Sequence, residues 1–263
     1  MKMKTMALAL ALVLPVSGGA VAAEKLDIVG TGDGINILRS LSSAFGETNP
    51  SVTVGVPDSI GSGGGVKAVG KGSYKLGRVA RPIKDKEKHY GLKYHPIAKI
   101  PVVFYVNKSV RVKGLSAEQV VGVYSGKIKN WKDVGGKDAP IRVVRREDGD
   151  SSLSVLKKTF PGFKELVMTK RAKTATSTPE SFASVEAKEG AIGFGPYSGA
   201  LAANVNILTV DGLAPTSPAY PSVTTLALIY KPDSRTGNVA SFLEFTTSMA
   251  GRQAIVSANA VPH

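Results

Sequence analysis

After its first two dozen residues the chain passes from a short apolar stretch into a helical pattern. Residues 25–30 have the apolar character of a strand and lead into a glycine-rich turn, Gly-Thr-Gly-Asp-Gly, at 30–34. Apolar residues then recur at near-helical spacing from Ile35 through Leu38 to Phe45. The pattern predicts a strand, a glycine turn and a helix in succession.

The same succession follows a second time. Residues 51–56 alternate between apolar and polar positions as in a strand, 57–65 form another glycine-rich turn, and a helix follows around Val66 and Val69. Residues 76–83 are a candidate third strand. Strands that alternate with helices predict an α/β fold with a mostly parallel sheet.

Two runs of β-branched and aromatic residues lie far apart in the chain. Residues 100–107 read Ile-Pro-Val-Val-Phe-Tyr-Val-Asn and residues 224–230 read Thr-Thr-Leu-Ala-Leu-Ile-Tyr. Both compositions suit buried strands. We interpret them as crossings between two lobes, with lobe 1 formed by 24–103 and 224–263 and lobe 2 by 104–223.

Further elements are predicted between and after these crossings. Ser116 is a suitable N-cap for a helix over 118–124, residues 141–144 have strand character, and a helix is expected over 151–160. An amphipathic helix is expected around 239–248. We find no solenoid repeat in this order.

The N-terminus has the parts of a secretory signal. Lys2 and Lys4 precede an apolar run from Met6 to Val16, and small residues follow up to Ala23. The apolar run is about 11 residues long, whereas a membrane-spanning helix needs about 20. We therefore expect residues 1–23 to be cleaved and the mature chain to reside in the periplasm. Since no cysteine follows, a lipid anchor there is not expected.

The charge of the chain indicates an anionic partner without specifying its kind. The sequence has 34 Lys and Arg against 20 Asp and Glu, a formal charge of +14, which falls by two when the signal is removed. Nucleic acid, acidic surfaces and anionic solutes all fit such a chain. Export and an aromatic content of 6 % argue against nucleic acid, because single strands bind by stacking on aromatic side chains.

The residues offer little support for an enzyme. The absence of cysteine excludes disulfides, thiolate metal sites and cysteine nucleophiles. Ser62 lacks the Gly-x-Ser-x-Gly elbow of the α/β-hydrolases, and the glycine loop lacks the Ser or Thr that ends a Walker motif. The three histidines lie in lysine-rich or terminal segments and are expected to be solvated: His89, His95 and His263. We therefore expect no enzymatic activity, no metal and no cofactor. A hydrolase, the competing hypothesis, would rely on three carboxylates: Asp33, Asp148 and Asp150.

Three turns rich in glycine or serine each precede a predicted helix: 30–34, 61–65 and 148–152. A helix start offers free backbone N–H groups and a positive dipole end, so it can hold an anion, and glycine lets a ligand approach the backbone. One such turn is usually a geometric device, whereas three that converge on one cleft would form a site. Arg146 precedes the third turn, and arginine donates bidentate hydrogen bonds to tetrahedral oxyanions. The alternative for Arg146 is an exposed ion pair.

These segments resemble the phosphate-binding proteins of ABC importers, a type II solute-binding protein family. Residues 61–67, Gly-Ser-Gly-Gly-Gly-Val-Lys, are similar to the family's glycine-serine phosphate loop, and residues 143–149 resemble its Val-Val-Arg-Arg-x-Asp-Gly stretch. Residues 124–128 with Trp131, and residues 190–194, extend the resemblance over nearly the whole mature chain. It implies a two-lobed, periplasmic-binding-protein-like α/β fold that closes on a ligand in the cleft between the lobes.

The resemblance also implies a role for each matching residue. Ser62 would donate its hydroxyl, and Gly63 and Gly64 their amides, to an oxygen of the anion. Arg146 would be the charged donor, and Asp148 would hold its guanidinium in place.

The third turn both follows and departs from the family pattern. Ser151 and Ser152 correspond to a glycine and a threonine of the family, which bind through N–H and hydroxyl groups. Asp150 stands where the family has serine, and a carboxylate there would repel an anion unless it caps the helix or accepts a proton from the ligand. In the first loop, Gly34 replaces the family's threonine, and Asp33 precedes it.

A further departure lies after the third strand. Many relatives place an aspartate there as acceptor for the protonated oxygen of phosphate, and this chain has Ala80. Strand alternation directs Arg78 to the same side as Ala80 and Arg81 to the other, so we expect Arg78 in the cleft and count both arginines among the candidate ligand residues.

Phosphate is the preferred ligand at this stage. Hydrogen phosphate needs an acceptor for its proton, which Asp33 or Asp150 could provide, whereas sulfate needs donors only. Sulfate, a phosphonate or an organic phosphate stays an alternative, as does a sensor that uses the same cleft. The expected partners are the small oxyanion and the membrane subunits of an ABC permease, and the protein is expected to be a monomer that binds no nucleic acid.

Overall fold

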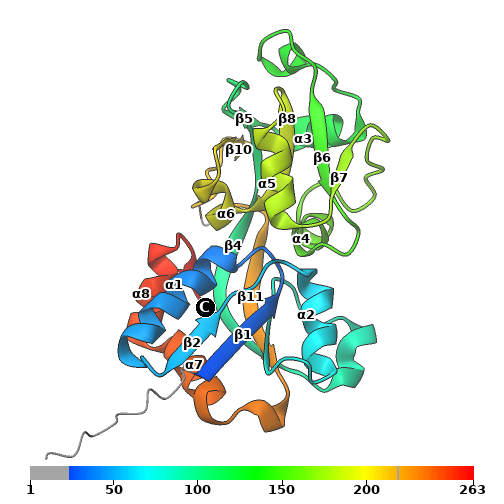
Figure 1. Cartoon of the computed structure of the whole chain (residues 1–263). Coiled ribbons are helices and arrows are strands. Elements are labelled where there is room, and N and C mark those ends of the chain that lie inside the picture. Colours follow the sequence, from blue (N-terminus) through cyan, green and yellow to red (C-terminus); the bar gives the residue numbers. More distant parts are fainter. Residues whose placement is uncertain (1–23, 218) are drawn as a thin grey trace, which may run out of the picture.

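A computed structural model describes residues 24–217 and 219–263, and it has two lobes joined by two long strands (Figure 1). The predicted signal segment, residues 1–23, lies outside the described residues. In the part of the chain that the structure describes, no helix is both long and apolar enough to span a membrane.

Lobe 1 begins with the predicted alternation of strands and helices. β1 (Glu24–Gly30), β2 (Val52–Gly55) and β3 (Leu76–Val79) are parallel to one another, and α1 (Ile35–Thr48) and α2 (Gly61–Gly70) connect them in turn. The glycine-rich segment itself forms the first turn of α2, so this helix starts earlier than its apolar spacing indicates. A 3-10 helix, η1 (Asp85–Tyr90), precedes the first crossing.

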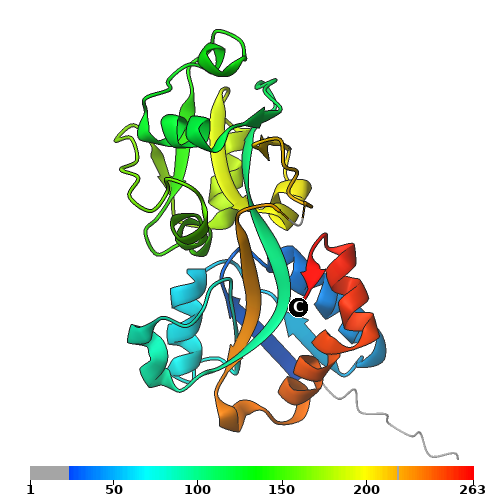
Figure 2. The same ribbon diagram turned by 180° about the vertical axis from the view of Figure 1, so that it is seen from behind.

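The two predicted crossings are strands that pair with each other. β4 (Lys93–Asn107) runs through both lobes, and β11 (Val223–Tyr230) lies antiparallel beside it from Lys93↔Tyr230 to Pro101↔Val223 (Figure 2). The sheet order is β2-β1-β3-β11-β4-β8-β6-β7, where β8 is Ala191–Pro196, β6 is Arg142–Arg146 and β7 is Lys173–Ala175. The sheet is mixed rather than mostly parallel. The crossing strands β4 and β11 pair antiparallel with their neighbours, whereas the other strands within each lobe pair parallel.

Lobe 2 is formed by the chain between the crossings, and the C-terminal elements return to lobe 1. The elements of lobe 2 are β5 (Gly114–Leu115), α3 (Ala117–Ser125), η2 (Trp131–Val134), β6 (Arg142–Arg146), α4 (Ser151–Thr159), β7 (Lys173–Ala175), α5 (Thr178–Glu186), β8 (Ala191–Pro196), α6 (Tyr197–Ala202), β9 (Val205–Ile207) and β10 (Thr209–Val210). After β11 come η3 (Pro232–Ser234), α7 (Gly237–Thr247), α8 (Met249–Ser257) and β12 (Val261–Pro262). Ser116 caps α3 as predicted, and its hydroxyl accepts from the Gln119 amide at 3.0 Å.

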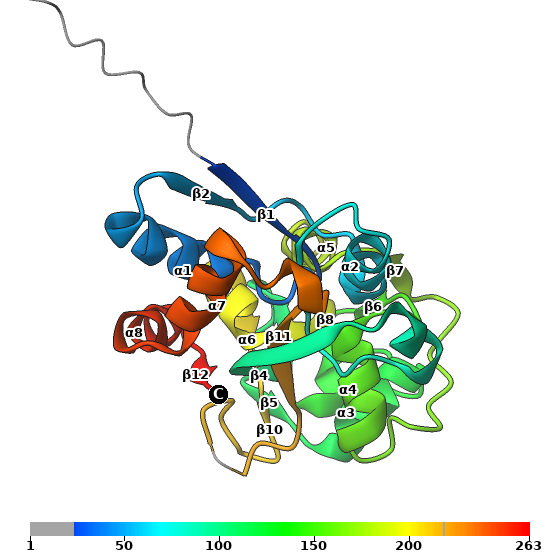
Figure 3. The same ribbon diagram turned by 90° about the horizontal axis from the view of Figure 1, so that it is seen from below.

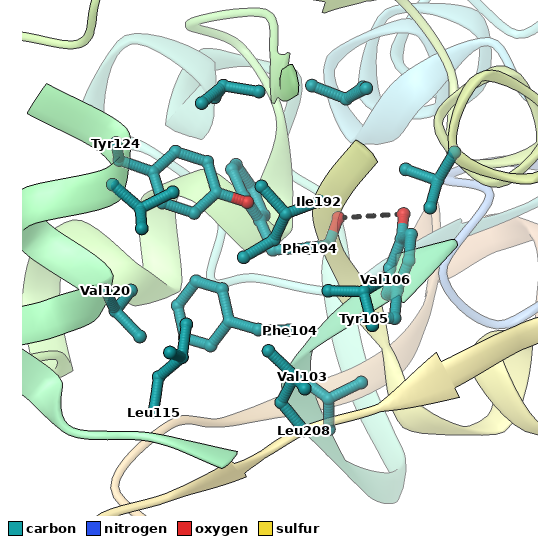
Figure 4. Close-up of a cluster of buried hydrophobic side chains, with 14 of the residues drawn as sticks. Val103, Phe104, Tyr105, Val106, Leu115, Val120, Tyr124, Ile192, Phe194 and Leu208 are labelled. Atoms are coloured by element: carbon teal, nitrogen blue, oxygen red, sulfur yellow. Dashed lines mark hydrogen bonds between the residues drawn. The ribbon is translucent and has the colours of Figure 1, made fainter. Parts of the chain in front are cut away.

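Each lobe has its own hydrophobic core. In lobe 2 the Phe104 ring packs against Tyr124 and Phe160, with ring centroids 5.8 and 5.1 Å apart, and Val103 and Val106 of the same strand are also buried (Figure 4). Full burial of side chains this large contributes about 1.5–3 kcal/mol each. The lobe 2 core draws on residues from Val102 onward, which makes β4 a member of both cores.

In lobe 1, helices cover both faces of the sheet. α1, α7 and α8 gather on one side and α2 lies on the other (Figure 3). The rings of Phe45 and Phe242 meet edge to face at 5.2 Å between α1 and α7. Along the chain, the core of lobe 1 includes Ile100 and the core of lobe 2 begins at Val102; the core of lobe 2 ends at Tyr220 and that of lobe 1 resumes at Leu226. The exact lobe boundaries stay a prediction.

One histidine differs from expectation. His95 lies half-buried on β4, and its Nε2 is 3.0 Å from the Thr246 hydroxyl. Burial lowers the pKa of this imidazole. His89 and His263 are exposed, as predicted.

Candidate functional site

The first residues of α2 and α4 meet the loop after β1 at the junction of the lobes. Ser62, in the first turn of α2, is buried, and its Oγ accepts from the Ala80 amide at 3.3 Å. The Ser151 hydroxyl, at the start of α4, lies 3.2 Å from both the Ser62 and the Thr31 hydroxyls. Two helix starts therefore present their free amides and hydroxyls to one place, from opposite lobes.

Asp33 connects the lobes through its carboxylate. It is 1 % exposed, and its Oδ2 accepts from the Ser152 hydroxyl at 3.0 Å while its Oδ1 accepts from the Thr178 hydroxyl at 2.7 Å. Both donors belong to lobe 2. Asp33, which precedes Gly34 in the first loop, is thus the acceptor at the centre of this cluster.

Arg146 ends β6 and is 2 % exposed. Its Nη2 is paired with Asp150 Oδ2 at 2.8 Å, its Nη1 donates to the Thr178 hydroxyl at 2.9 Å, and its Nε donates to the Ala175 carbonyl at 3.2 Å. Thr178 accepts from Arg146 and donates to Asp33, so its hydroxyl links the guanidinium to the second carboxylate. One buried guanidinium faces two buried carboxylates.

Asp150 caps α4 and also faces this cluster. Its Oδ1 accepts from the Leu153 amide at 2.8 Å, and its Oδ2 carries the ion pair with Arg146. Burial raises the pKa of Asp150 to about 7, and the negative charge of Asp33 adds to the rise while Arg146 opposes it. The capping alternative for Asp150 is therefore confirmed, and the same carboxylate also pairs with the Arg146 guanidinium.

The predicted role of Asp148 is wrong. Its carboxylate is exposed and accepts from Arg145 Nη2 at 2.6 Å. Neighbouring residues of a strand point to opposite faces, so Arg145 and Arg146 diverge. The exposed turn carries Asp148 to the Arg145 side, and Asp150, at the start of α4, reaches the Arg146 guanidinium instead.

The expectation that Arg78 enters the cleft is wrong. Its side chain instead donates hydrogen bonds to backbone carbonyls of the first loop and its neighbours. It is fully buried, and its Nε donates to the Thr31 carbonyl at 2.6 Å, its Nη2 to the Pro57 carbonyl at 2.7 Å, and its Nη1 to the Ile28 carbonyl. Burial lowers the pKa of Arg78 to about 10. Its donors face backbone carbonyls, so we place it outside the proposed ligand set.

Arg81 likewise has a partner within the protein. Its two Nη atoms donate to the Glu87 carboxylate at 2.8 and 2.7 Å, and Glu87 also accepts from the Lys84 amide at 2.9 Å. The pair anchors η1 beside the start of α2. This arrangement makes Arg81 a brace for the loop that follows β3.

The predicted glycines have different surroundings. Gly34 is buried as the N-cap of α1 against the Leu226 side chain, whereas Gly63 is exposed and Gly64 half-buried in the first turn of α2. A cavity of about 420 Å³ opens beside Asp33 between the lobes, with Arg39 and Asp58 among its lining residues. Asp33 and Thr178, which belong to the polar cluster, are among its other lining residues.

Two members of the cluster were not among the predicted site residues. Thr31 belongs to the first glycine turn, and Thr178 is the first residue of α5, whose N-cap is Ser177. The Ser-Thr-Pro-Glu sequence at 177–180 is a helix-start signature that could have drawn attention to Thr178. In the described residues, no group of three or more His, Cys, Asp or Glu side chains forms a candidate metal site.

Comparison with known proteins identifies the class. Residues 15–250 match the family described as the PBP superfamily domain. This match spans most of the chain, so the protein belongs to the PBP superfamily.

Individual relatives narrow the likeness. The phosphate-binding protein PstS of Bacillus subtilis is 27% identical over 250 residues, which cover 90% of this chain and 79% of that protein. PstS of Staphylococcus saprophyticus is 34% identical over 210 residues, which cover 74% of this chain and 64% of that protein. A substrate-binding protein from Clostridium perfringens, assigned to a phosphate ABC transporter and solved with bound phosphate, has a TM-score of 0.82 at 28% identity, with 91% of this chain and 100% of that chain covered.

Proposed function

We propose that this protein is the periplasmic solute-binding component of an ABC importer and that it captures inorganic phosphate between its lobes. The observation that carries the proposal is the convergence of two helix starts, five hydroxyls and the Arg146 guanidinium on one buried cluster shared by both lobes. The names of the most similar relatives and the bound phosphate of the Clostridium perfringens structure support it.

The donors of the cluster suit a tetrahedral oxyanion. Ser62 and Ser152 supply hydroxyls from different lobes, the first turns of α2 and α4 supply amides, and Arg146 supplies charge. An anion that accepts from both lobes binds best when they are closed, so binding and closure are coupled. Capture of this kind makes and breaks no covalent bond.

The carboxylates favour an anion that brings a proton. Asp33 accepts hydrogen bonds at the centre of the cluster, and hydrogen phosphate can donate one, whereas sulfate cannot. Asp33 would thereby replace the acceptor that the Ala80 position lacks. We also propose that the chain acts as a monomer and delivers its ligand to the membrane subunits of a permease.

Titration calorimetry tests the proposal. Phosphate, sulfate, arsenate, molybdate and a phosphonate are titrated into the mature protein under one set of conditions. We expect phosphate and arsenate, which share their geometry and protonation, to bind more tightly than sulfate and molybdate. Tighter binding of sulfate or of the phosphonate would overturn phosphate as the ligand, and no binding of any of the five would overturn the oxyanion function.

A further inference from the structure

Lobe 2 carries a second concave region away from the cleft. A groove of about 840 Å³ runs along the N-terminal end of β6 between the end of α3 and the outer side of α5. Arg142 lies in it, at the opposite end of β6 from Arg146, so these two residues are about 13 Å apart along the strand. We call it the lobe 2 groove.

Positive charge gathers around this groove. Five of its lining side chains are exposed cations: Lys129, Arg142, Arg171, Lys173 and Lys188. Within residues 24–217 and 219–263 none of the five forms an ion pair. The one acidic lining residue, Glu180, already accepts from the Thr176 amide at 2.7 Å and its hydroxyl at 2.8 Å.

The floor of the groove is apolar and held in place. Val123, Ile128, Ile141 and Val143 line it together with Ala183 and Ala187 of α5. Backbone hydrogen bonds fix the walls: Ile141 donates to the Lys129 carbonyl at 2.8 Å, and Thr169 donates to the Tyr124 carbonyl at 2.8 Å. The groove is therefore a preformed feature whose chemistry combines cations at the rim with aliphatic side chains beneath.

A neighbouring groove lengthens the region. It has a volume of about 500 Å³ and shares Pro140, Arg142 and Lys188 with the first. The charged residues that it adds are two cations, Arg111 and Lys137, and two carboxylates, Asp138 and Glu189. Together the two hollows form one extended surface, and its excess of positive charge lies around the lobe 2 groove. Its length suits a chain segment better than a single small anion.

We propose that the lobe 2 groove binds an acidic peptide segment of a partner protein, with carboxylates paired to the rim cations and aliphatic side chains on the floor. Unpaired like charges around one hollow repel one another, and an acidic segment relieves that repulsion. The apolar floor favours a peptide over polyphosphate or nucleic acid, because those polymers have no aliphatic side chains to bury there. The proposal does not depend on the identity of the ligand in the cleft.

Fluorescence anisotropy with defined probes tests this. A labelled peptide that alternates Glu and Val is compared with an all-Glu peptide of equal charge and with inorganic polyphosphate, at about 0.15 M salt, where surface charges are screened beyond about 8 Å. We expect the alternating peptide to bind at least tenfold more tightly than the all-Glu peptide, about 1.4 kcal/mol. Equal or tighter binding of all-Glu peptide or polyphosphate would overturn the peptide assignment.

A charge-matched pair of double variants locates the site. Arg142→Glu with Lys188→Glu should weaken binding of the alternating peptide at least tenfold, about 1.4 kcal/mol. Lys71→Glu with Lys86→Glu makes the same change of net charge on exposed positions of lobe 1. This variant should change the affinity for the alternating peptide less than about twofold. Equal losses would show attraction by net charge alone and overturn the site. Circular dichroism checks the fold, and phosphate calorimetry should be unchanged in the lobe 2 variant.

Discussion

Arg145 and Arg146 are adjacent in β6 but have opposite surroundings. Arg146 is buried with all three nitrogens bonded inside the cluster, whereas Arg145 pairs with the exposed Asp148. Exposed ion pairs contribute about 0–1 kcal/mol. Truncation of a buried, hydrogen-bonded charge costs about 2–5 kcal/mol.

The two arginines provide a matched test at the scale of a residue. We expect Arg146→Ala to weaken phosphate binding by about 2–5 kcal/mol, and Arg145→Ala to change it by less than about 1 kcal/mol. Calorimetry on both variants measures the difference. Equal effects would show that the charge of the strand, and not the bonded geometry of Arg146, holds the anion.

We expect Asp150 to make anion binding depend on pH through the protein itself. Its pKa is raised to about 7 by burial and by Asp33, so the carboxyl is neutral below that pH and negative above it. A negative Asp150 repels an anion and competes for Arg146, so affinity should weaken as pH rises through about 7. Sulfate keeps its charge over this range, and its affinity should fall by up to about tenfold per pH unit, the limit for one linked proton.

Asp150→Asn supplies the control for this dependence. Asparagine is also a good N-cap, so α4 keeps its cap while the titrating group is removed. Sulfate affinity in the variant should be nearly constant with pH. A slope equal to that of the wild type would assign the dependence to another group.

Asp33 is a stronger candidate than Asp150 for accepting a hydrogen bond from a protonated phosphate oxygen. Both of its oxygens already act as acceptors toward hydroxyls, and each retains a lone pair for a protonated phosphate oxygen. Asp33→Asn should narrow the preference for phosphate over sulfate by about tenfold, about 1.4 kcal/mol. An unchanged ratio of the two affinities would mean that donors and shape alone select the anion.

At this scale the sequence predicted the donors better than their partners. Ser62, Ser151 and Arg146 lie in recognisable motifs, and the structure brings them to one cluster. Thr178 was missed because it reaches the cluster from a helix far along the chain. Arg78 was misplaced because alternation gives the side of a strand that a residue faces and says nothing of the carbonyls that a long side chain can reach.

At the scale of elements, close contact between α2 and β1 sets the position of the Ser62 hydroxyl. A Cβ atom at Gly65 would lie 2.8 Å from the Gly30 Cα, closer than side chains allow. Gly30 itself has a φ of 140°, which L side chains rarely adopt. Two glycines thus let the helix lie directly on the strand end.

Gly65→Ala should push α2 away from β1. We expect a loss of about 1–3 kcal/mol in the free energy of unfolding, as for other overpacked positions, and weaker phosphate binding because Ser62 moves. Gly46→Ala is the control, since a Cβ there meets open space inside α1, and it should stabilise by about 0.5–1 kcal/mol. Denaturant unfolding measures the stability of both variants. Equal free energies of unfolding would refute the close contact between α2 and β1.

The element order shows where sequence patterns reach their limit. β1, α1 and α4 begin within one residue of the predicted positions, because apolar spacing and turn residues agree there. β4 starts earlier than its apolar run, since residues 93–99 are ordered by pairing with β11. Short elements such as β7, β9 and β10 have two or three residues and depend on tertiary neighbours.

At the scale of the whole molecule, four hydrogen-bonded contacts join the lobes across the cleft: Thr31–Ser151, Ser62–Ser151, Ser152–Asp33 and Thr178–Asp33. They place the polar side chains of one lobe within hydrogen-bonding distance of those of the other. We expect phosphate to shift the protein toward this closed arrangement, and the radius of gyration in small-angle scattering to fall slightly on saturation.

Arg146→Ala is the control for closure. At a phosphate concentration that saturates the wild type, this variant should keep the scattering profile of the ligand-free protein. If phosphate binds the wild type by calorimetry but leaves its scattering unchanged, the two lobes do not move on capture.

The pairing of β4 with β11 has a consequence for how such a chain can be altered. Pro101 and Val223 are register partners, and the Val102 amide donates to the Ser222 carbonyl at 2.8 Å. The segment between Pro101 and Val223, which contains lobe 2, therefore begins and ends at neighbouring points about 5 Å apart. Lobe 2 is arranged as an insertion into a hairpin, and a short turn joining residues 101 and 223 would leave the sheet of lobe 1 with both of its strands. Lobes of different specificity could be exchanged at these two positions without altering the order of the remaining elements.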